Sequence, residues 1–306
     1  MEVGRWGNFA PNFHLLTPIS LIFMPELPEV EVLARHLRPA LTGKTIRAVV
    51  VRRNRVLYPT SSARFKKALA GAKFLGLQRR GKYLLFELRR AGSRENFFLL
   101  GHLGMTGRMF LAPKNEPLPK HAAVMLELGA KNFIYEDTRY FGRLTLDVSA
   151  IEKLGPEPWD NNFTPEMFHR ALKSSRQPVK VKLLDQTLVT GVGNIYASEA
   201  LFRAGISPRR AANRLTLVQA ENLLRCVREV LQAAIDCGST IPLNFSAHQS
   251  DGLFYYGRAV GAGDFYTERL LVYDRAGKPC VQCGAPIRRI VQAARSTFFC
   301  AYCQKG

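Results

Sequence analysis

Four cysteines near the C-terminus have the spacing of a metal site. Two residues separate Cys280 from Cys283, two separate Cys300 from Cys303, and sixteen lie between the pairs. Each Cys-x2-Cys makes a tight turn that can direct both sulfurs at one ion, and two such turns complete the tetrahedron typical of Zn²⁺. Because four protein ligands leave no open position, we expect one structural Zn²⁺; buried free thiols are the alternative. This use of cysteine favours a reducing compartment over a disulfide framework.

A proline and a glutamate follow Met24. In a chain that started at Met24, removal of that methionine would expose the secondary amine of Pro25. An α-amino group has a pKa of about 7.7–8.0, so part of it is neutral and nucleophilic at pH 7. Such an amine could attack a sugar C1′ and give an iminium, while Glu26 protonates the sugar ring oxygen. Inside a longer chain the same residues would be an acidic helix start with a favourable dipole interaction.

Three loops carry weaker signals. Thr190–Asn194 places glycines ahead of a helix, where backbone N–H groups can bind an anion, although a turn that needs positive φ gives the same pattern. Gly101–Gly107 by itself predicts only a tight turn between strands. Asp137–Gly142 places a cation and two aromatic side chains on a probable hairpin. Beside DNA they could wedge between bases and fill the gap left by a flipped nucleotide; otherwise they form an ordinary surface turn.

The charge balance favours a polyanionic partner. Lysine and arginine exceed aspartate and glutamate by 44 − 24 = 20, and Val32 to Phe86 contains fourteen basic residues and no acid. Neutralised phosphates release counterions and so favour binding, whereas a merely solvated surface mixes signs. Charge alone also permits a heparin-like polymer or an anionic membrane. A hydrophobic content of 47% excludes a wholly disordered chain. No run approaches the roughly 18 apolar residues of a membrane span.

The elements that must position these residues fall into three groups. Pro28 begins a helical pattern, and Gly43 lies just past its end. From Thr45 to about Val148 we expect short strands, joined by glycine turns into a sandwich or barrel.

After Gly155 the periodicity becomes helical. One helix is expected from Pro165, one from Ile195 with Asn194 as its N-cap, and a long one behind a capping box that starts at Thr216. Short strands surround the cysteines. The sequence thus predicts an α+β multidomain protein, with residues 1–23 as an extension, 24–153 as an N-terminal β-rich domain, 154–268 as a helical domain and 269–306 as a small metal module with a basic hairpin.

Six segments, taken together, resemble the formamidopyrimidine-DNA glycosylase family, bacterial repair enzymes for oxidised purines. They are residues 25–31, 79–84, 102–107, 154–158 and 191–199, and the four cysteines. The likeness runs from Met24 to the C-terminus. It implies a β-sandwich, a helix–two-turn–helix domain and a zinc finger. It also implies base excision repair by a bifunctional glycosylase and AP lyase, which removes 8-oxoguanine and formamidopyrimidines through a proline iminium and cleaves the strand by β,δ-elimination.

The resemblance also implies roles for matching residues. Pro25 would be the nucleophile and Glu26 the general acid, with Lys82 in the same catalytic group. Lys82, Lys180, Asn194 and Arg295 would hold phosphates around the lesion, and Met105, Arg139 and Phe141 would fill the space left by the flipped base. No redox cofactor or catalytic metal is implied. The expected partner is double-stranded DNA with oxidised bases, bound by a monomer in the bacterial cytoplasm, at the nucleoid when on DNA.

Three departures from the family pattern matter. Thr138 and Tyr140 stand where the family usually has Pro and Arg. The stretch Ile241–Glu268 looks longer than usual, which leaves the lesion preference open. The extension of residues 1–23 is the most serious, because an internal Pro25 has an amide nitrogen and no nucleophile. We expect that Met24 is the true start and that the extension is a mis-called leader or disordered; no export signal is evident.

Two alternatives stay open. An endonuclease VIII-like glycosylase shares the fold and nucleophile but prefers oxidised pyrimidines, and Glu26-Leu27-Pro28 favours the purine branch. A non-catalytic protein that binds lesion DNA is the second, and it would apply if Pro25 is never freed.

Overall fold

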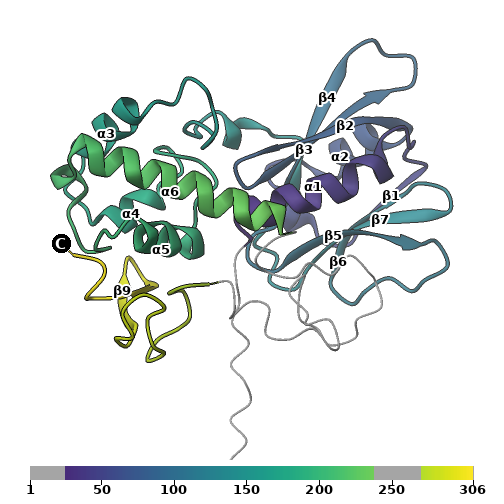
Figure 1. Cartoon of the computed structure of the whole chain (residues 1–306). Coiled ribbons are helices and arrows are strands. Elements are labelled where there is room, and N and C mark those ends of the chain that lie inside the picture. The colour runs from purple at the N-terminus through teal and green to yellow at the C-terminus, as the bar shows by residue number, and fades with distance from the viewer. Residues whose placement is uncertain (1–24, 238–269, 306) are drawn as a thin grey trace, which may run out of the picture.

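A computed structural model describes residues 25–237 and 270–305 of the chain. The predicted extension and the Ile241–Glu268 segment lie outside the described residues. Figure 1 shows a β-rich domain on one side, a helical domain on the other and a small C-terminal module beneath the helices.

The N-terminal domain is a β-sandwich, as predicted. Two antiparallel four-stranded sheets have the orders β2-β3-β4-β8 and β1-β6-β7-β5. Apolar residues of both sheets share one core, in which the rings of Phe86 (β3) and Phe133 (β7) meet edge to face with centroids 5.7 Å apart. The strands are β1 (Ala48–Val51), β2 (Ala72–Arg80), β3 (Tyr83–Arg90), β4 (Asn96–His102), β5 (Gly107–Pro113), β6 (Ala122–Glu127), β7 (Lys131–Asp137) and β8 (Arg143–Thr145).

Helix α1 (Leu27–Leu41) packs along β2 and buries Val30, Leu33 and Leu37 in the sandwich core. The expectation of strands throughout 45–148 was wrong in one segment. A second helix, α2 (Ser62–Leu69), lies there, because the Ser61 hydroxyl caps its first turn and its two buried apolar residues are one helical turn apart. Short 3₁₀ turns, η1 (Asn54–Leu57) and η2 (Ser149–Ile151), flank the strands.

The helical domain contains α3 (Pro165–Lys173), α4 (Val179–Leu183), α5 (Asn194–Arg203), η3 (Ala212–Arg214) and α6 (Leu217–Asp236). The predicted capping box is confirmed: Gln219 N donates to Thr216 Oγ1 at 3.2 Å, and Thr216 N donates to Gln219 Oε1 at 3.1 Å. The predicted N-cap of α5 was wrong. Gly193 occupies that position, and the Asn194 side chain instead bonds to the C-terminal module.

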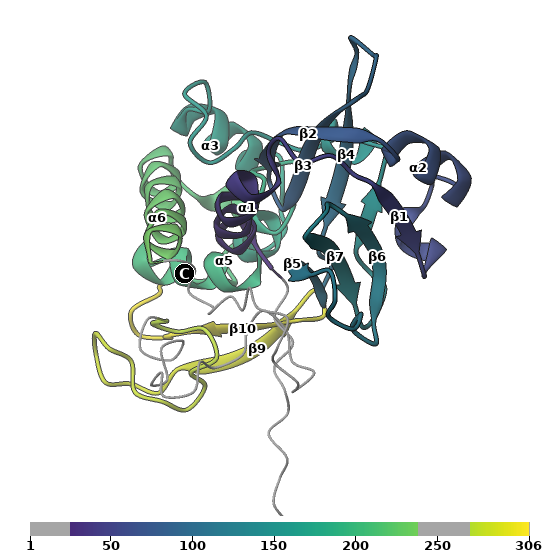
Figure 2. The same ribbon diagram turned by 90° about the vertical axis from the view of Figure 1, so that its right-hand side faces the viewer.

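The C-terminal module is a hairpin of β9 (Arg288–Gln292) and β10 (Arg295–Phe299) beside the cysteine turns. Ala293 and Ala294 both have positive φ, 47° and 58°, as a two-residue hairpin turn of type I′ requires. Figure 2 shows the hairpin running beneath α5. Its buried residues belong to the same core as the helical domain, so the module is fixed to that domain by apolar packing. In the described ranges, no helix combines the length and apolarity needed to cross a membrane.

Candidate active site

Glu26 connects the two large domains. Its carboxylate accepts hydrogen bonds from Ile195 N at 2.9 Å and Tyr196 N at 3.4 Å, two amides in the first turn of α5. A Cβ on Gly193 would lie 2.2 Å from Glu26 Cδ, so only glycine leaves room for this approach. For the glycine loop before α5 the sequence left two readings open, a turn that needs positive φ and an anion site at a helix N-terminus, and both hold: Gly191 has a φ of 91°. The anion that lies there is the protein's own carboxylate.

Burial makes the Glu26 carboxyl an unusually weak acid. Glu26 is 2% exposed, and its burial raises the carboxyl pKa to about 7, although the nearby Lys82 charge and the α5 amides lower it. A carboxyl with this pKa is partly protonated at neutral pH and can act as a general acid. Pro25, directly before it, is also buried at this junction.

A second carboxylate, Glu29, supports the first and was missed in the sequence. Glu29 Oε2 accepts from Glu26 N at 2.8 Å, and Glu29 Oε1 accepts from the Tyr196 hydroxyl at 2.6 Å. Glu29 is 1% exposed. It therefore fixes the backbone beside Pro25 to α5. Its position three residues after Glu26 is the spacing of a capping box, which was the available signal.

Lys82 is the second residue of the tight turn between β2 and β3, and that turn is fixed by Glu157. Glu157 Oε1 accepts from Gly81 N at 2.7 Å and from Arg80 at 3.2 Å, while Oε2 accepts from Arg79 at 2.8 Å. Burial lowers the pKa of Lys82, and the Glu26 and Glu29 carboxylates oppose that effect. The charges of Lys82 and Glu26 thus act on one another, which supports a place for Lys82 near this pair, and its role in catalysis stays a prediction. Glu157 lies in the quoted Leu154–Pro158 motif but was given no role.

His102, at the end of β4, was also given no role. Its ring packs on the Tyr83 ring with centroids 4.6 Å apart, and Nδ1 accepts from Gly104 N at 3.1 Å. Burial lowers its pKa to about 4, and the charges of Lys82 and Arg143 add to this effect. The imidazole is therefore neutral at pH 7 with its hydrogen on Nε2, where it can donate to an anion.

Lys180 and Asn194 connect the helical domain to the hairpin. Lys180 Nζ donates to Asn194 Oδ1 at 2.6 Å, to Ser296 O at 3.0 Å and to Thr297 Oγ1 at 2.8 Å, and the residue is 1% exposed. Burial lowers its pKa to about 7. All three ammonium donors are thus used within the chain, and a direct phosphate contact would have to replace one of them. Arg295 is exposed at the start of β10, and its charge lowers the pKa values of both Lys180 and Lys82.

The three predicted wedge residues come from two adjoining loops. Arg139 and Phe141 are exposed, and Met105 is half-buried. The loops meet without a gap, because a Cβ on Gly104 would lie 2.6 Å from Gly142 N.

Asp137 ties these two loops together. Its carboxylate, fully buried, accepts hydrogen bonds from the Thr106 hydroxyl, from Arg139 N at 3.1 Å and from Gly142 N at 2.9 Å. The loop carrying Met105 and the loop carrying Arg139 are therefore held in one arrangement.

The four cysteines form the predicted metal centre. Their Sγ atoms all lie within 4.8 Å of one another, with 3.8 Å between Cys280 and Cys303 and 3.5 Å between Cys283 and Cys300. Zn–S bonds of about 2.3 Å in a tetrahedron place sulfurs about 3.8 Å apart, so the four thiols fit one Zn²⁺. The ion would fix the two turns on either side of the hairpin that carries Arg295.

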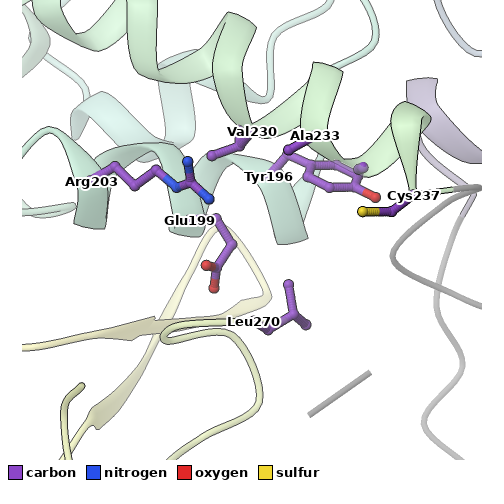
Figure 3. A pocket seen from close by; sticks show the side chains of 8 residues that line it. Tyr196, Glu199, Arg203, Val230, Ala233, Cys237 and Leu270 are labelled. Carbon is purple, nitrogen blue, oxygen red and sulfur yellow. The ribbon is translucent and has the colours of Figure 1, made fainter. Parts of the chain in front are cut away.

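A pocket of about 190 Å³ lies between α5, α6 and Leu270. Figure 3 shows Glu199 on its wall, with its carboxylate directed at the chain that enters the C-terminal module. Glu199 accepts from the backbone N–H groups of Leu271, Val272 and Tyr273 at 2.8–2.9 Å. This buried carboxylate anchors the segment that carries Tyr273, whose hydroxyl accepts from Asn194 at 3.2 Å.

Three domain models match the chain in order, and two of them are specific to one family. They are the formamidopyrimidine-DNA glycosylase N-terminal domain over residues 24–144, the formamidopyrimidine-DNA glycosylase H2TH domain over 154–245, and the zinc finger found in FPG and IleRS over 277–306. The chain belongs to the formamidopyrimidine-DNA glycosylase family.

Curated members of this family are similar over nearly their whole length. The formamidopyrimidine-DNA glycosylase of Thermus thermophilus is 44% identical over 92% of this chain and 98% of its own. That of Desulfitobacterium hafniense is 40% identical over 92% and 100%.

Solved structures of the family agree in fold. One is a point mutant of the Lactococcus lactis FPG in complex with a Fapy-dG containing DNA, at 34% identity and a TM-score of 0.80. Another is MutM in complex with carbocyclic 8-oxo-G containing DNA, at 35% identity and a TM-score of 0.79. Each covers 92% of this chain and 100% of its own. The predicted combination of sandwich, helix–two-turn–helix domain and zinc finger is confirmed.

Proposed function

We propose that this protein is a bifunctional DNA glycosylase and AP lyase of base excision repair that removes oxidised purines from double-stranded DNA. The observation on which this proposal rests is the pair formed by Pro25 and Glu26. The glutamate has a pKa raised to about 7 and is held at the N-terminus of α5, directly beside the proline. The relatives support the substrate class, since their names and titles refer to formamidopyrimidine and 8-oxoguanine DNA.

The chemistry begins with the amine of Pro25. Its lone pair forms a bond to C1′ of the damaged nucleotide, and the bond from C1′ to the base breaks, with its electron pair leaving on the base. The departing base takes up the proton that the attached nitrogen loses. The nitrogen lone pair then opens the sugar ring: the bond from C1′ to the ring oxygen breaks as Glu26 donates its proton to that oxygen, and an iminium joins Pro25 to the sugar.

Strand cleavage follows from that iminium. The iminium withdraws electrons, so the C2′ proton becomes acidic and the 3′ phosphate leaves by β-elimination. A second, δ-elimination releases the 5′ phosphate, and water then hydrolyses the iminium to free Pro25.

The surrounding residues would position the DNA. Lys82 is a basic side chain near Glu26, and the charge of Arg295 reaches Lys82, while the neutral His102 offers an N–H donor to a phosphate. Met105, Arg139 and Phe141 would enter the duplex where the damaged nucleotide leaves it. Lys180 and Asn194 would hold the hairpin that carries Arg295 at the phosphate backbone.

One chain supplies every residue of this site, which supports action as a monomer. The bacterial relatives support a place in the cytoplasm, with the chromosome. The separate apolar cores of the sandwich and of the helical domain support the proposed boundary between residues 24–153 and 154–268. The cysteine turns and their hairpin support residues 269–306 as a small module that packs on the helical core.

The test uses protein that begins at Pro25. With a duplex containing 8-oxoguanine opposite cytosine, we expect base release and a one-nucleotide gap. A duplex containing thymine glycol serves as the comparison. Faster cleavage of that duplex would assign the protein to the endonuclease VIII-like class. Tight binding of either duplex without cleavage would indicate a lesion-binding protein without activity.

A further inference from the structure

Tyr140 has an unusual backbone conformation between two of the wedge residues. Its φ is 53°, in the left-handed region that a bulky side chain adopts only when its surroundings hold it there. On either side of it, the Arg139 guanidinium lies 4.8 Å from the centroid of the Phe141 ring. The two wedge side chains therefore stack on one another across a strained residue.

Arg53 is the residue that holds Tyr140. Arg53 Nε donates to the Tyr140 hydroxyl at 3.1 Å, and its guanidinium carbon lies 5.4 Å from the centre of the tyrosine ring. The backbone of Arg53 is fixed in turn, because Arg53 N donates to Ala123 O at 3.2 Å at the edge of the sandwich. Tyr140 also packs against the sandwich core.

A second cation–π contact joins the same two segments. Two residues after Arg53, the guanidinium of Arg55 lies 6.0 Å from the Phe141 ring centroid. Phe141 nevertheless remains 46% exposed. Arg53 and Arg55 thus face two consecutive aromatic residues of the wedge loop, which is residues 138–142 between β7 and β8. This loop is held by the segment after β1 as well as by its own strands.

We propose that Arg53 and Tyr140 are positioning residues, which hold Arg139 and Phe141 in the orientation that enters the duplex and so set the efficiency of lesion extrusion. This inference rests on the proposed function. It concerns insertion into paired DNA and not the chemistry at C1′. A substrate that needs no insertion should be insensitive to the pair.

The experiment compares two substrates in protein that begins at Pro25. One is the 8-oxoguanine:cytosine duplex under single-turnover conditions. The other is a single strand with a preformed abasic site, which has no base stack to enter. Arg53→Met keeps the length of the side chain without its charge. Tyr140→Leu keeps apolar bulk without the ring and hydroxyl.

We expect each substitution to slow excision from the duplex about tenfold, because it removes both a cation–π contact and a hydrogen bond. Cleavage of the single strand should stay unchanged. Because both side chains act as one contact, the double variant should be no slower than either single variant. Tyr140→Phe, which loses only the hydroxyl, should fall between wild type and Tyr140→Leu and keeps the proposal testable if Tyr140→Leu folds poorly. Arg94→Met, which removes an exposed charge at the far end of β4, is the matched control and should behave as wild type.

Unchanged duplex excision in Arg53→Met and Tyr140→Leu would overturn the proposal. So would equal losses on both substrates, or additive losses in the double variant; the last would mean that Arg53 acts by itself, as a phosphate contact. Failure of the proposed function gives a different result, since the wild-type protein itself would then not excise 8-oxoguanine from the duplex.

Discussion

The chemical centre and the wedge loop are each organised by a buried carboxylate, and they use it differently. Glu26 is held by amides of another domain, and burial raises its pKa to about 7. Asp137 is surrounded by donors of its own two loops, including a hydroxyl and two backbone amides. The first arrangement leaves a proton available for transfer. The second fixes a backbone shape and leaves Arg139 and Phe141 exposed for contact with DNA.

The sharpest test of this contrast is Glu26→Gln, which cannot donate a proton but can still accept from the α5 amides. Excision of 8-oxoguanine should fall by about 10²–10⁴, the usual contribution of a general acid. Cleavage at a preformed abasic site, whose sugar ring opens to the aldehyde in water without the enzyme, should fall much less. Single-turnover gel assays on both substrates measure this, and equal losses would show that Glu26 acts only as an interdomain cap.

Removal of zinc should have the next largest effect. The two cysteine turns hold the hairpin that carries Arg295 and supplies the acceptors of Lys180. A chelator should therefore weaken lesion-DNA binding roughly a hundredfold at constant salt, and added Zn²⁺ should restore it. Fluorescence anisotropy measures the affinity. Undiminished binding by metal-free protein, verified by elemental analysis, would contradict a role for the module in holding DNA.

The pH dependence of the free energy of unfolding should also reflect the raised pKa of Glu26. Folding raises the pKa of this carboxyl from its ordinary 4.5 to about 7, so the folded state favours the protonated form. The wild-type protein therefore loses stability as the pH rises through this window, and the loss is complete above pH 7. Glu26→Gln lacks the ionisation. The difference in free energy of unfolding between this variant and wild type should therefore shift in favour of the variant by on the order of 2 kcal/mol from pH 5 to pH 8. Urea unfolding at both pH values tests this, and parallel changes in the two proteins would refute the raised pKa.

Asp137→Asn should have the smallest effect. The amide keeps one acceptor but presents an N–H to the donors that met the other oxygen, namely Gly142 N and the Tyr135 hydroxyl. The loop should loosen, and excision from duplex DNA should slow about tenfold, equivalent to about 1.4 kcal/mol, within the cost of an unmade buried hydrogen bond. The abasic single strand is the control. A larger loss there than on the duplex would place Asp137 in the chemistry and remove the contrast with Glu26.

Local spacing made much of the fold and part of the site predictable. The cysteine pairs, the Thr216 capping box and the glycines before α5 each indicate a local structure through residues close together in the sequence. The sequence could not show which distant residues these local structures contact in the folded protein. The glycine loop indicates an anion, but only the packed domains show that the anion is Glu26.

Side chains that act through distant neighbours were missed for the same reason. No local pattern distinguishes Glu157 or Glu199 from other acids in the sequence, and that of Glu29 is only a capping-box spacing. All three carboxylates act by accepting hydrogen bonds from amides and hydroxyls of other segments. Asn194 shows the converse error. Its local position predicted an N-cap, whereas its side chain meets a hairpin about a hundred residues later, at Ser296.

The central claim is that Pro25, once it is the free N-terminus, attacks the sugar. The most direct measurement is borohydride trapping on an 8-oxoguanine:cytosine duplex, with protein that begins at Pro25 and, in parallel, protein that begins at Met1. Reduction of the iminium should give a covalent protein–DNA band from the first protein and none from the second, whose Pro25 nitrogen is an amide. No band from protein that begins at Pro25, together with tight binding of the same duplex, would contradict the account.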